Sequence, residues 1–394
     1  MERLEVQGFM AAGIAAGIKK SEKKDLGLIY SQVPANAAGV FTCNKVQAAP
    51  VILSRERVQS GICQAIVVNS GNANCCTGDA GLHDAGIMAR LAATGLKISE
   101  EMVLVASTGV IGEPLPMEKI EAGLPAIIDA LSPQGFADLA EAVMTTDKVP
   151  KTAVGQGSIN GKGFKITGVA KGAGMIRPDM ATMLCFVCTD VKATSKVLKT
   201  TLVKAAKRSF NRISIDGDTS TNDTVLVMAN GLSDAVIQSS DDIAVFQKIL
   251  DDILLDLAKQ LVRDGEGVTK LVEILVQGAA TESDARNIAE TVAHSPLVKT
   301  AFFGEDANWG RIIAAVGRAD ATVDPDKIDV YFDKVQMVKA GMGCGKSVEA
   351  EATKILKKKD FSVTVDLNIA GGNAAMLTCD FSTDYVRINA DYRS

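Results

Sequence analysis

Short apolar runs rich in β-branched residues alternate along this chain with segments of helical periodicity, and this alternation limits the fold more than any other feature. The runs have the length of buried strands and are bounded by turn residues, glycine above all. They lie at residues 28–31, 65–69, 102–107, 164–170, 183–189, 224–230, 272–277, 327–332 and 361–367. The pattern predicts a mixed α/β (α+β) fold of layered sheets.

Helical spacing is clearest over residues 241–263, where apolar side chains recur every three or four positions. Ser240 is a suitable N-cap and Gly265 follows the expected end. Further helices are expected over residues 117–131, 136–144, 195–210, 282–293 and 309–316. At roughly 150 residues per domain, the 394 residues correspond to two or three domains' worth of core. We expect the helices to flank the sheets.

The charge balance excludes several classes of partner. Lys and Arg number 42 against 47 Asp and Glu, so the net charge is −5 and no overall basic field attracts nucleic acid or anionic membranes. No apolar run reaches the roughly 18 residues that a membrane span needs. The first residues, MERLEVQGFM, have neither the basic nor the apolar region of a signal peptide. We therefore expect a cytoplasmic protein without nucleic-acid or membrane partners.

The cysteines and histidines do not form the patterns that a metal site or a histidine-activated nucleophile would need. Cys185 and Cys188 form a CxxC pair, but they lie inside the apolar stretch MLCFVC, which is typical of a buried strand rather than a zinc or redox site. His83 and His294 stand in helix-like segments without an obvious catalytic partner. We predict no metal site, and a nucleophile that works without histidine would suit this chain.

A glycine-rich turn and a proline lead from Lys171 to the pair Ala181–Thr182, directly before an apolar strand. Two interpretations are open. In the first, Thr182 merely begins the strand, where threonine is common. In the second, Thr182 attacks the preceding peptide carbonyl, and an N→O acyl shift with ester hydrolysis frees it as a new N-terminus. Its α-amine, with a reference pKa of about 7.7–8.0, could then deprotonate its own hydroxyl.

The order of many segments along nearly the whole chain resembles the ornithine acetyltransferase family (glutamate N-acetyltransferase, ArgJ). They read GIKKSEKKDLGLIYS, AAGVFTCNKVQAAPV, VVNSGNANCCTG, ASTGVIGEPLP, MTTDKVPK, KGAGMIRPDMATML, SIDGDTSTND, DGEG, FGEDANWGRI and DYVRINADYRS. Single segments are weak signals, but their ordered combination with Ala-Thr at the junction is highly specific. The resemblance implies self-cleavage between Ala181 and Thr182. The resulting chains, 1–181 and 182–394, would form one composite fold of the N-terminal-nucleophile (DmpA/ArgJ-like) type.

The resemblance also implies the reaction. Thr182 accepts acetyl from N2-acetylornithine as an ester and releases ornithine; glutamate then takes the acetyl group, giving N-acetylglutamate in a ping-pong cycle of arginine biosynthesis. Some members also use acetyl-CoA as donor, and no other cofactor is implied. The two chains are expected to assemble as an α2β2 heterotetramer. The alternative is a self-cleaved N-terminal-nucleophile aminopeptidase or amidase, which passes the acyl group to water.

Acyl transfer also needs hydrogen-bond donors that stabilise the oxyanion of the tetrahedral intermediate. Thr108 and Gly109 end the apolar run MVLVAS, and the Thr108 hydroxyl and the Gly109 N–H could converge on one point because glycine lets a reactant approach. From the residues alone, an ordinary exit from a strand into a turn is the favoured interpretation. The resemblance places the oxyanion hole at this pair.

An acetylated amino-acid substrate needs a cation or several donors for its α-carboxylate. Lys171 matches the family's substrate-binding lysine, although a lone lysine is by default a solvated loop residue. Its charge could also hold the Thr182 amine neutral. Thr145 matches the family's substrate threonine; Thr146 is adjacent, and a helix-capping cluster is the other interpretation.

Further substrate contacts rest on the later part of the chain. Glu266 lies between two glycines after the long helix, where it could bind the side-chain amine of ornithine, and it matches the family's substrate glutamate. Asp264 is the neighbouring residue that could have this role instead. The other interpretation of the segment is an exposed C-cap loop. By resemblance, Asn389 and Ser394 are the last two substrate contacts. The chain departs from the family pattern at Asp179, where Asn is common, and at Ser394, where Thr is commoner. These departures leave room for altered substrate affinity or donor choice.

Overall fold

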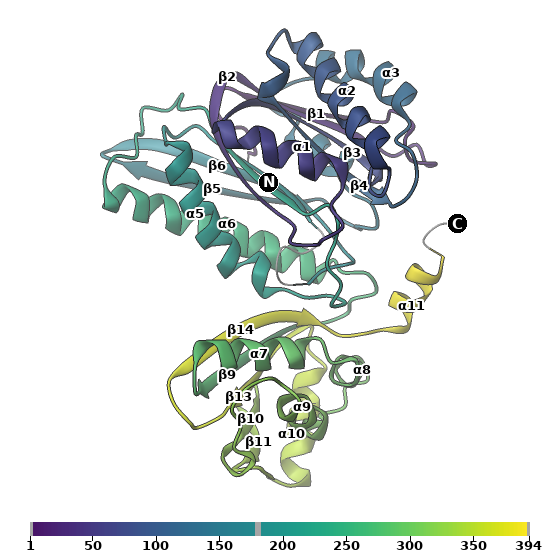
Figure 1. Cartoon of the computed structure of the whole chain (residues 1–394). Coiled ribbons are helices and arrows are strands. Elements are labelled where there is room, and N and C mark those ends of the chain that lie inside the picture. Colours follow the sequence, from purple (N-terminus) through teal and green to yellow (C-terminus); the bar gives the residue numbers. More distant parts are fainter. Residues whose placement is uncertain (1–2, 178–182, 392–394) are drawn as a thin grey trace. The chain divides into compact units, whose positions relative to one another are not determined.

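The computed structural model describes residues 3–177 and 183–391, so the predicted positions Ala181, Thr182 and Ser394 lie outside the described residues. The chain forms two compact units (Figure 1). The large unit comprises Met1–Asn211 and Asp218–Leu261, and the small unit comprises Arg212–Gly217 and Val262–Ser394.

The large unit is built on a sheet with strand order β4-β3-β2-β8-β7-β6-β5, and β1 pairs with β2 beside this path. The pairs β3–β4 and β7–β8 are parallel and the others are antiparallel. The strands are β1 Phe9–Ile14, β2 Leu26–Phe41, β3 Ile62–Asn72, β4 Val103–Val110, β5 Lys151–Ile159, β6 Lys162–Lys171, β7 Leu184–Thr189 and β8 Thr224–Ala229.

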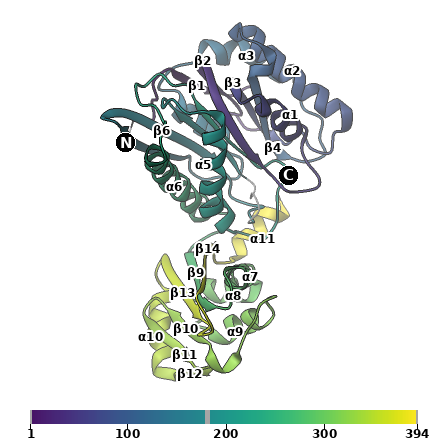
Figure 2. The ribbon, with the colours of Figure 1, turned by 60° about the vertical axis from the view of Figure 1, so that its left-hand side comes forward.

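Helices cover this sheet in layers because the strands are apolar on both faces. In β3, Ala65 and Val67 pack with α1, α2 and α3, whereas Ile66 and Val68 join a second cluster with α4 and with Phe186 of β7. Helix α5 packs on β2, and α6 lies against β5 and β6 (Figure 2). The helices are α1 Ala49–Arg57, α2 Gly78–Leu96, α3 Met117–Asp129, α4 Phe136–Ala142, α5 Ser195–Arg208 and α6 Ser240–Arg263, with 3₁₀ turns at Val58–Ser60, Glu100–Met102 and Phe210–Arg212.

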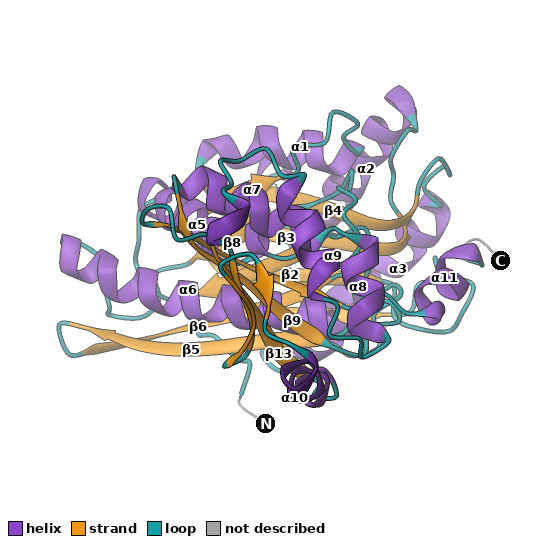
Figure 3. Ribbon diagram, turned by 90° about the horizontal axis from the view of Figure 1, so that it is seen from below, coloured by secondary structure: helices purple, strands orange, loops and turns teal. Residues whose placement is uncertain are grey.

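The small unit has two layers, one sheet and one set of helices, which Figure 3 separates by colour. Its strand order is β12-β11-β10-β13-β9-β14. In β9, Val272 and Ile274 face the core formed with α7 to α10, while Glu273 points away from it. Its elements are β9 Leu271–Ala279, α7 Glu282–Ala293, α8 Pro296–Phe303, α9 Trp309–Gly317, a 3₁₀ turn Pro325–Lys327, β10 Asp329–Phe332, β11 Val335–Lys339, β12 Met342–Gly343, α10 Lys346–Leu356, β13 Asp360–Asp366, β14 Gly372–Cys379 and α11 Thr383–Ala390.

The predicted mixed α/β architecture of layered sheets and flanking helices is confirmed. Cys185 and Cys188 lie in β7 and are buried, as expected of a strand rather than a metal site. Within the described ranges, no three His, Cys, Asp or Glu side chains are grouped as a metal ion would need. Among the helices that are described, none is long and apolar enough to cross a membrane.

The structure extends the predicted strand at 28–31 into a much longer one. Strand β2 continues past Pro34 because its register against β3 shifts between Tyr30 and Ala35, which takes the proline out of the hydrogen-bonded ladder. Strand β14, which the sequence pattern missed, mixes small and polar residues (GNAAMLTC) and is held by its pairing with β9. Pairing with a neighbouring strand therefore determines the length of β2 and the presence of β14, because the local β-propensity is weak in both.

Candidate active site

The end of β4 brings Thr108 and Gly109 to one edge of the large unit's sheet. Parallel pairing with β3 places Thr108 beside Ser70 and Gly109 beside Gly71. Gly109 has φ 137°, and a Cβ there would lie 2.3 Å from the Gly71 carbonyl carbon. Only glycine fits this position, because a side chain would meet both a backbone clash and a strained φ. The predicted close approach at Gly109 thus has a structural basis.

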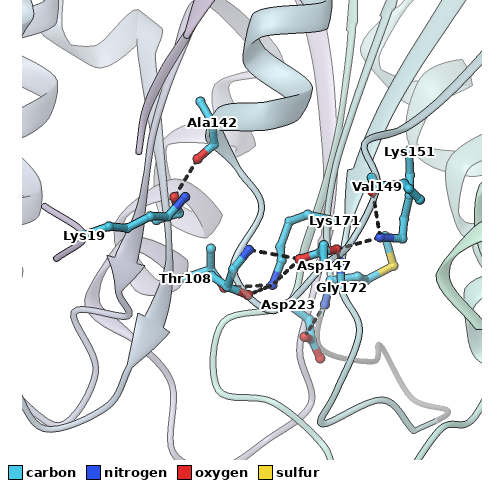
Figure 4. A network of polar contacts seen from close by, with 12 residues as sticks. Lys19, Thr108, Ala142, Asp147, Val149, Lys151, Lys171, Gly172 and Asp223 are labelled. Atoms are coloured by element: carbon cyan, nitrogen blue, oxygen red, sulfur yellow. Dashed lines mark hydrogen bonds and ion pairs between the residues drawn. The ribbon is translucent and has the colours of Figure 1, made fainter. Parts of the chain in front are cut away.

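Lys171 stands at the last position of β6, where it is buried, and its ammonium reaches two threonine hydroxyls. Its Nζ donates to the Thr145 Oγ1 at 2.9 Å and to the Thr108 Oγ1 at 3.3 Å (Figure 4). The interpretation of Lys171 as a solvated loop residue is therefore wrong. Three of the predicted site residues, from three separate segments of the sequence, lie together within the large unit.

Asp147 is the counter-ion of this cluster, and the sequence analysis gave it no role. Its side chain is buried, its Oδ1 lies 2.7 Å from the Lys151 Nζ and its Oδ2 lies 3.8 Å from the Lys171 Nζ. The backbone N–H groups of Gly172 and Thr145 donate to it at 2.7 and 3.0 Å. Burial alone would raise the pKa of the Asp147 carboxyl, but the charges of Lys171 and Lys151 bring it well below its ordinary range.

These bonds bear on the choice between Thr145 and Thr146. Helix α4 ends at Ala142, so the threonines do not cap it. Instead, Thr145 donates its N–H to Asp147 and accepts from Lys171 through its hydroxyl. The segment MTTD thus folds into a local turn that turns the Thr145 side chain toward the lysine.

A third lysine, Lys19, adds positive charge near the same cluster. Burial lowers the pKa of Lys19 to about 8, against the opposing effect of Asp25. The Asp25 carboxylate is buried and accepts from the backbone N–H of Lys19 at 2.9 Å. Lys171 lowers the pKa of Lys19 further and Asp147 raises it, so the two lysines act on each other electrostatically.

Asp223 is the other carboxylate that the sequence analysis did not assign, although it lies in the quoted segment SIDGDTSTND. It is fully buried, and its Oδ1 accepts from the backbone N–H of Met183 at 3.0 Å. Its Oδ2 has no hydrogen-bond partner among the described residues. Burial raises the pKa of Asp223 well above its ordinary value. The carboxyl therefore accepts the N–H of the residue that follows Thr182, and its burial disfavours the charged form.

In the small unit, Glu266 and Asn389 lie together. The Asn389 Nδ2 donates to the Glu266 Oε2 at 2.8 Å. Glu266 is buried, so the interpretation of its loop as an exposed C-cap is wrong. The loop is fixed against the start of α11, since the Ser382 hydroxyl donates to the Gly267 carbonyl oxygen at 2.6 Å and a Cβ at Gly267 would lie 2.4 Å from the Tyr385 nitrogen.

The nearest rival of Glu266, Asp264, is also buried. The structure thus joins Thr108, Thr145 and Lys171 in the large unit, and Glu266 and Asn389 in the small unit. The roles of these residues in binding or catalysis stay predictions, as does the division at 181/182.

Comparison with known proteins identifies the family. The model of the ArgJ family matches residues 10–394. The arginine biosynthesis bifunctional protein ArgJ of Syntrophotalea carbinolica is 53% identical over 393 residues, which cover 99% of this chain and 100% of that protein. ArgJ of Geobacter sulfurreducens is 51% identical over the same shares of both chains. The crystal structure of ornithine acetyltransferase from Mycobacterium tuberculosis, complexed with ornithine, shares 37% identity, with a TM-score of 0.41 over 45% of this chain and 96% of the other. This chain belongs to the ArgJ family.

Proposed function

We propose that this ArgJ family member is an acetyltransferase of arginine biosynthesis that cleaves itself before Thr182 and uses Thr182 as its nucleophile. The observation that carries the proposal is the position of Lys171. Its ammonium bridges the hydroxyls of Thr108 and Thr145, and Lys171 pairs with Leu184 across strands β6 and β7. Leu184 lies two residues after Thr182 in the sequence, and its pairing with Lys171 supports the proposal that Lys171 and the nucleophile act together.

The chemistry follows from what each group can donate. The Thr182 α-amine takes the proton of its own hydroxyl, and the oxygen attacks the acetyl carbonyl of N2-acetylornithine. Because the Thr108 oxygen accepts from Lys171, its own O–H is left to donate to the oxyanion, together with the Gly109 N–H. Collapse of the intermediate expels ornithine, whose amine takes the proton, and leaves acetyl-Thr182. Glutamate then attacks this ester through its amine, and N-acetylglutamate leaves.

The substrate groups find partners of matching chemistry. Lys171 and the Thr145 hydroxyl suit the α-carboxylate. The Glu266 carboxylate, oriented by Asn389, suits the side-chain ammonium of ornithine, and Ser394 completes the predicted contacts. The relatives from Syntrophotalea carbinolica and Geobacter sulfurreducens are both called bifunctional, which supports acetyl-CoA as a second donor for the same acetyl-Thr182 intermediate. We infer a cytoplasmic enzyme whose partners are these small molecules.

Two cleaved chains would still share one fold. Strand β7, after the cut, lies between β6 from the first chain and β8 from the second, and β8 in turn pairs with β2 from the first. The backbone ladder therefore ties the predicted chains 1–181 and 182–394 together on both sides of the cut. We propose that they remain associated and assemble as an α2β2 heterotetramer.

Intact mass with N-terminal sequencing tests the cut, and an acetyl-transfer assay tests the reaction. We expect two chains, the second beginning Thr182-Met183-Leu184, and transfer of acetyl from N2-acetylornithine to glutamate. Thr182→Ala should remain one chain without activity, Thr182→Ser should still be cleaved because serine keeps the hydroxyl, and the exposed control Thr94→Ala should match the wild type. A Thr182→Ala protein that still acetylates glutamate would refute the mechanism. Release of acetate without N-acetylglutamate would favour the aminopeptidase or amidase alternative.

A further inference from the structure

A cavity of about 840 Å³ in the large unit is lined by the end of β2, by α1 with the turn after it, and by α5. Four of its lining residues are cations and none is a carboxylate, although the whole chain carries a net charge of −5. The cations are Arg55, Lys196, Lys199 and Lys207. Such a local excess of positive charge attracts anions in particular, because nothing in the lining neutralises it.

The guanidinium of Arg55 is held in place rather than free to turn. It donates to the Gln47 Oε1 at 2.8 Å and to the Thr42 carbonyl oxygen at 3.0 Å, and it lies 5.5 Å from the ring centre of Phe41. None of these partners carries a negative charge, so the charge of Arg55 remains available to a ligand. A positioned arginine of this kind suits the oxygens of a phosphate group.

The lysines of α5 add to this charge. The Lys199 ammonium donates to the Gly39 carbonyl oxygen, and burial together with the charge of Arg55 lowers its pKa. Among the described residues, Lys196, Lys199 and Lys207 form no ion pair with a carboxylate. Apolar side chains, among them Val58 and Val203, make up much of the remaining wall. Cations beside apolar surface match an organic molecule that bears several phosphates better than they match a small amino acid.

The cavity wall is connected to the predicted catalytic edge. The Thr42 N–H donates to the Asp223 carbonyl oxygen at 3.0 Å, and Asp223 in turn holds the N–H of Met183. Across the sheet, Phe41 pairs with Thr224, which pairs with Leu184. Two strand spacings separate Phe41 from Leu184, about 10 Å. A ligand held in the cavity would thus have its far end within reach of the start of β7, the strand that follows Thr182 in the sequence.

From this charge, wall chemistry and position, we propose that the cavity binds the phosphate groups of an organic phosphate, and that its ligand is the nucleotide end of acetyl-CoA used as acetyl donor. The choice of donor rests on the proposed function, whereas the phosphate site rests on the cavity alone. N2-acetylornithine carries no phosphate, so its reaction does not use the cavity.

The test is a double variant, Lys199→Gln with Lys207→Gln, in the full processed enzyme. The matched control is Lys204→Gln, which lies on the same helix but does not line the cavity. We expect the double variant to raise KM for acetyl-CoA about tenfold or more, with kcat nearly unchanged, because each lost charge-assisted bond weakens binding of the phosphates. Transfer from N2-acetylornithine should equal that of the wild type and of the control.

Direct titration with desulfo-CoA and with ATP separates the possible ligands, and it does not depend on turnover. Tight desulfo-CoA binding that weakens with added salt and in the double variant supports the proposal. If ATP binds in a lysine-dependent way and desulfo-CoA does not bind, the cavity is a phosphate site for a free nucleotide. That result overturns the assignment of acetyl-CoA as the ligand. Equal desulfo-CoA affinity in wild type and double variant overturns the cavity as the site. A wild type without transfer from N2-acetylornithine counts against the proposed function instead.

Discussion

Replacing Asp147 by asparagine probes the charge cluster beneath the candidate active site. In the wild type, the carboxylate lies 2.7 Å from the Lys151 Nζ and 3.8 Å from the Lys171 Nζ, and all three side chains are nearly fully buried. Removing one partner of a buried ion pair costs about 3–5 kcal/mol, because the other charge stays buried without compensation. With a urea dependence of roughly 3 kcal/mol per molar for a chain of this size, the unfolding midpoint should fall by about 1 to 1.7 M.

The pH dependence gives a second readout of Asp147→Asn. Since the pKa of Asp147 is lowered in the folded state, its stabilisation is fully present above about pH 5 and is lost as the pH falls through the depressed pKa. The difference in unfolding free energy between wild type and variant should shrink over the same range. The exposed control Asp129→Asn should change the midpoint little. A loss below about 1 kcal/mol for Asp147→Asn at pH 7 would refute the argument that buried charge holds this cluster.

Two further substitutions test separate parts of the site. Thr108→Ala removes a hydrogen-bond donor to the oxyanion, so it should lower kcat by about 10- to 1000-fold and slow self-cleavage. Steady-state kinetics and intact mass measure the two effects, and the control Thr94→Ala should show neither. Unchanged kinetics in Thr108→Ala would mean that the oxyanion hole lies elsewhere. Burial raises the pKa of Asp223 in the folded state, so the wild type loses up to about 1.4 kcal/mol of stability per pH unit as the pH rises from about 4 to that raised pKa. Asp223→Asn has no such proton to retain, so its stability relative to the wild type should increase over the same range. Urea unfolding at several pH values measures this slope, and a flat difference would show that Asp223 is ionised.

The sequence predicted the elements whose signal is local. The strand at 183–189 and the helix at 241–263 begin and end within a residue of their expected bounds. In each case the local pattern of apolar side chains, a continuous run or a repeat every three or four residues, is enough to define one buried element. The glycine at position 109 was likewise readable, since a close approach leaves few alternatives to glycine.

The two buried carboxylates could not be predicted in the same way. Asp147 stands in MTTDKVPK as a residue typical of caps and turns, and its role depends on Lys171, which arrives from another strand. Asp223 is identified by its burial and by the N–H of Met183, both of which arise from the pairing of β7 with β8. Which charges share a buried site is decided by strand order, which periodicity does not contain.

The pairing of one carboxylate with two lysines would leave the cluster with a positive charge that serves the proposed catalysis. A single Lys171–Asp147 pair would be nearly neutral, but Lys151 also binds Asp147, so the cluster retains one positive charge. An oxyanion bound to the Thr108 hydroxyl would lie about 6 Å from the Lys171 ammonium, where an effective dielectric constant of about 20 gives an attraction on the order of 3 kcal/mol. That corresponds to about a hundredfold in rate, comparable with one oxyanion-hole donor. Lys151, which reaches Lys171 only through Asp147, would thus set the charge with which Lys171 acts.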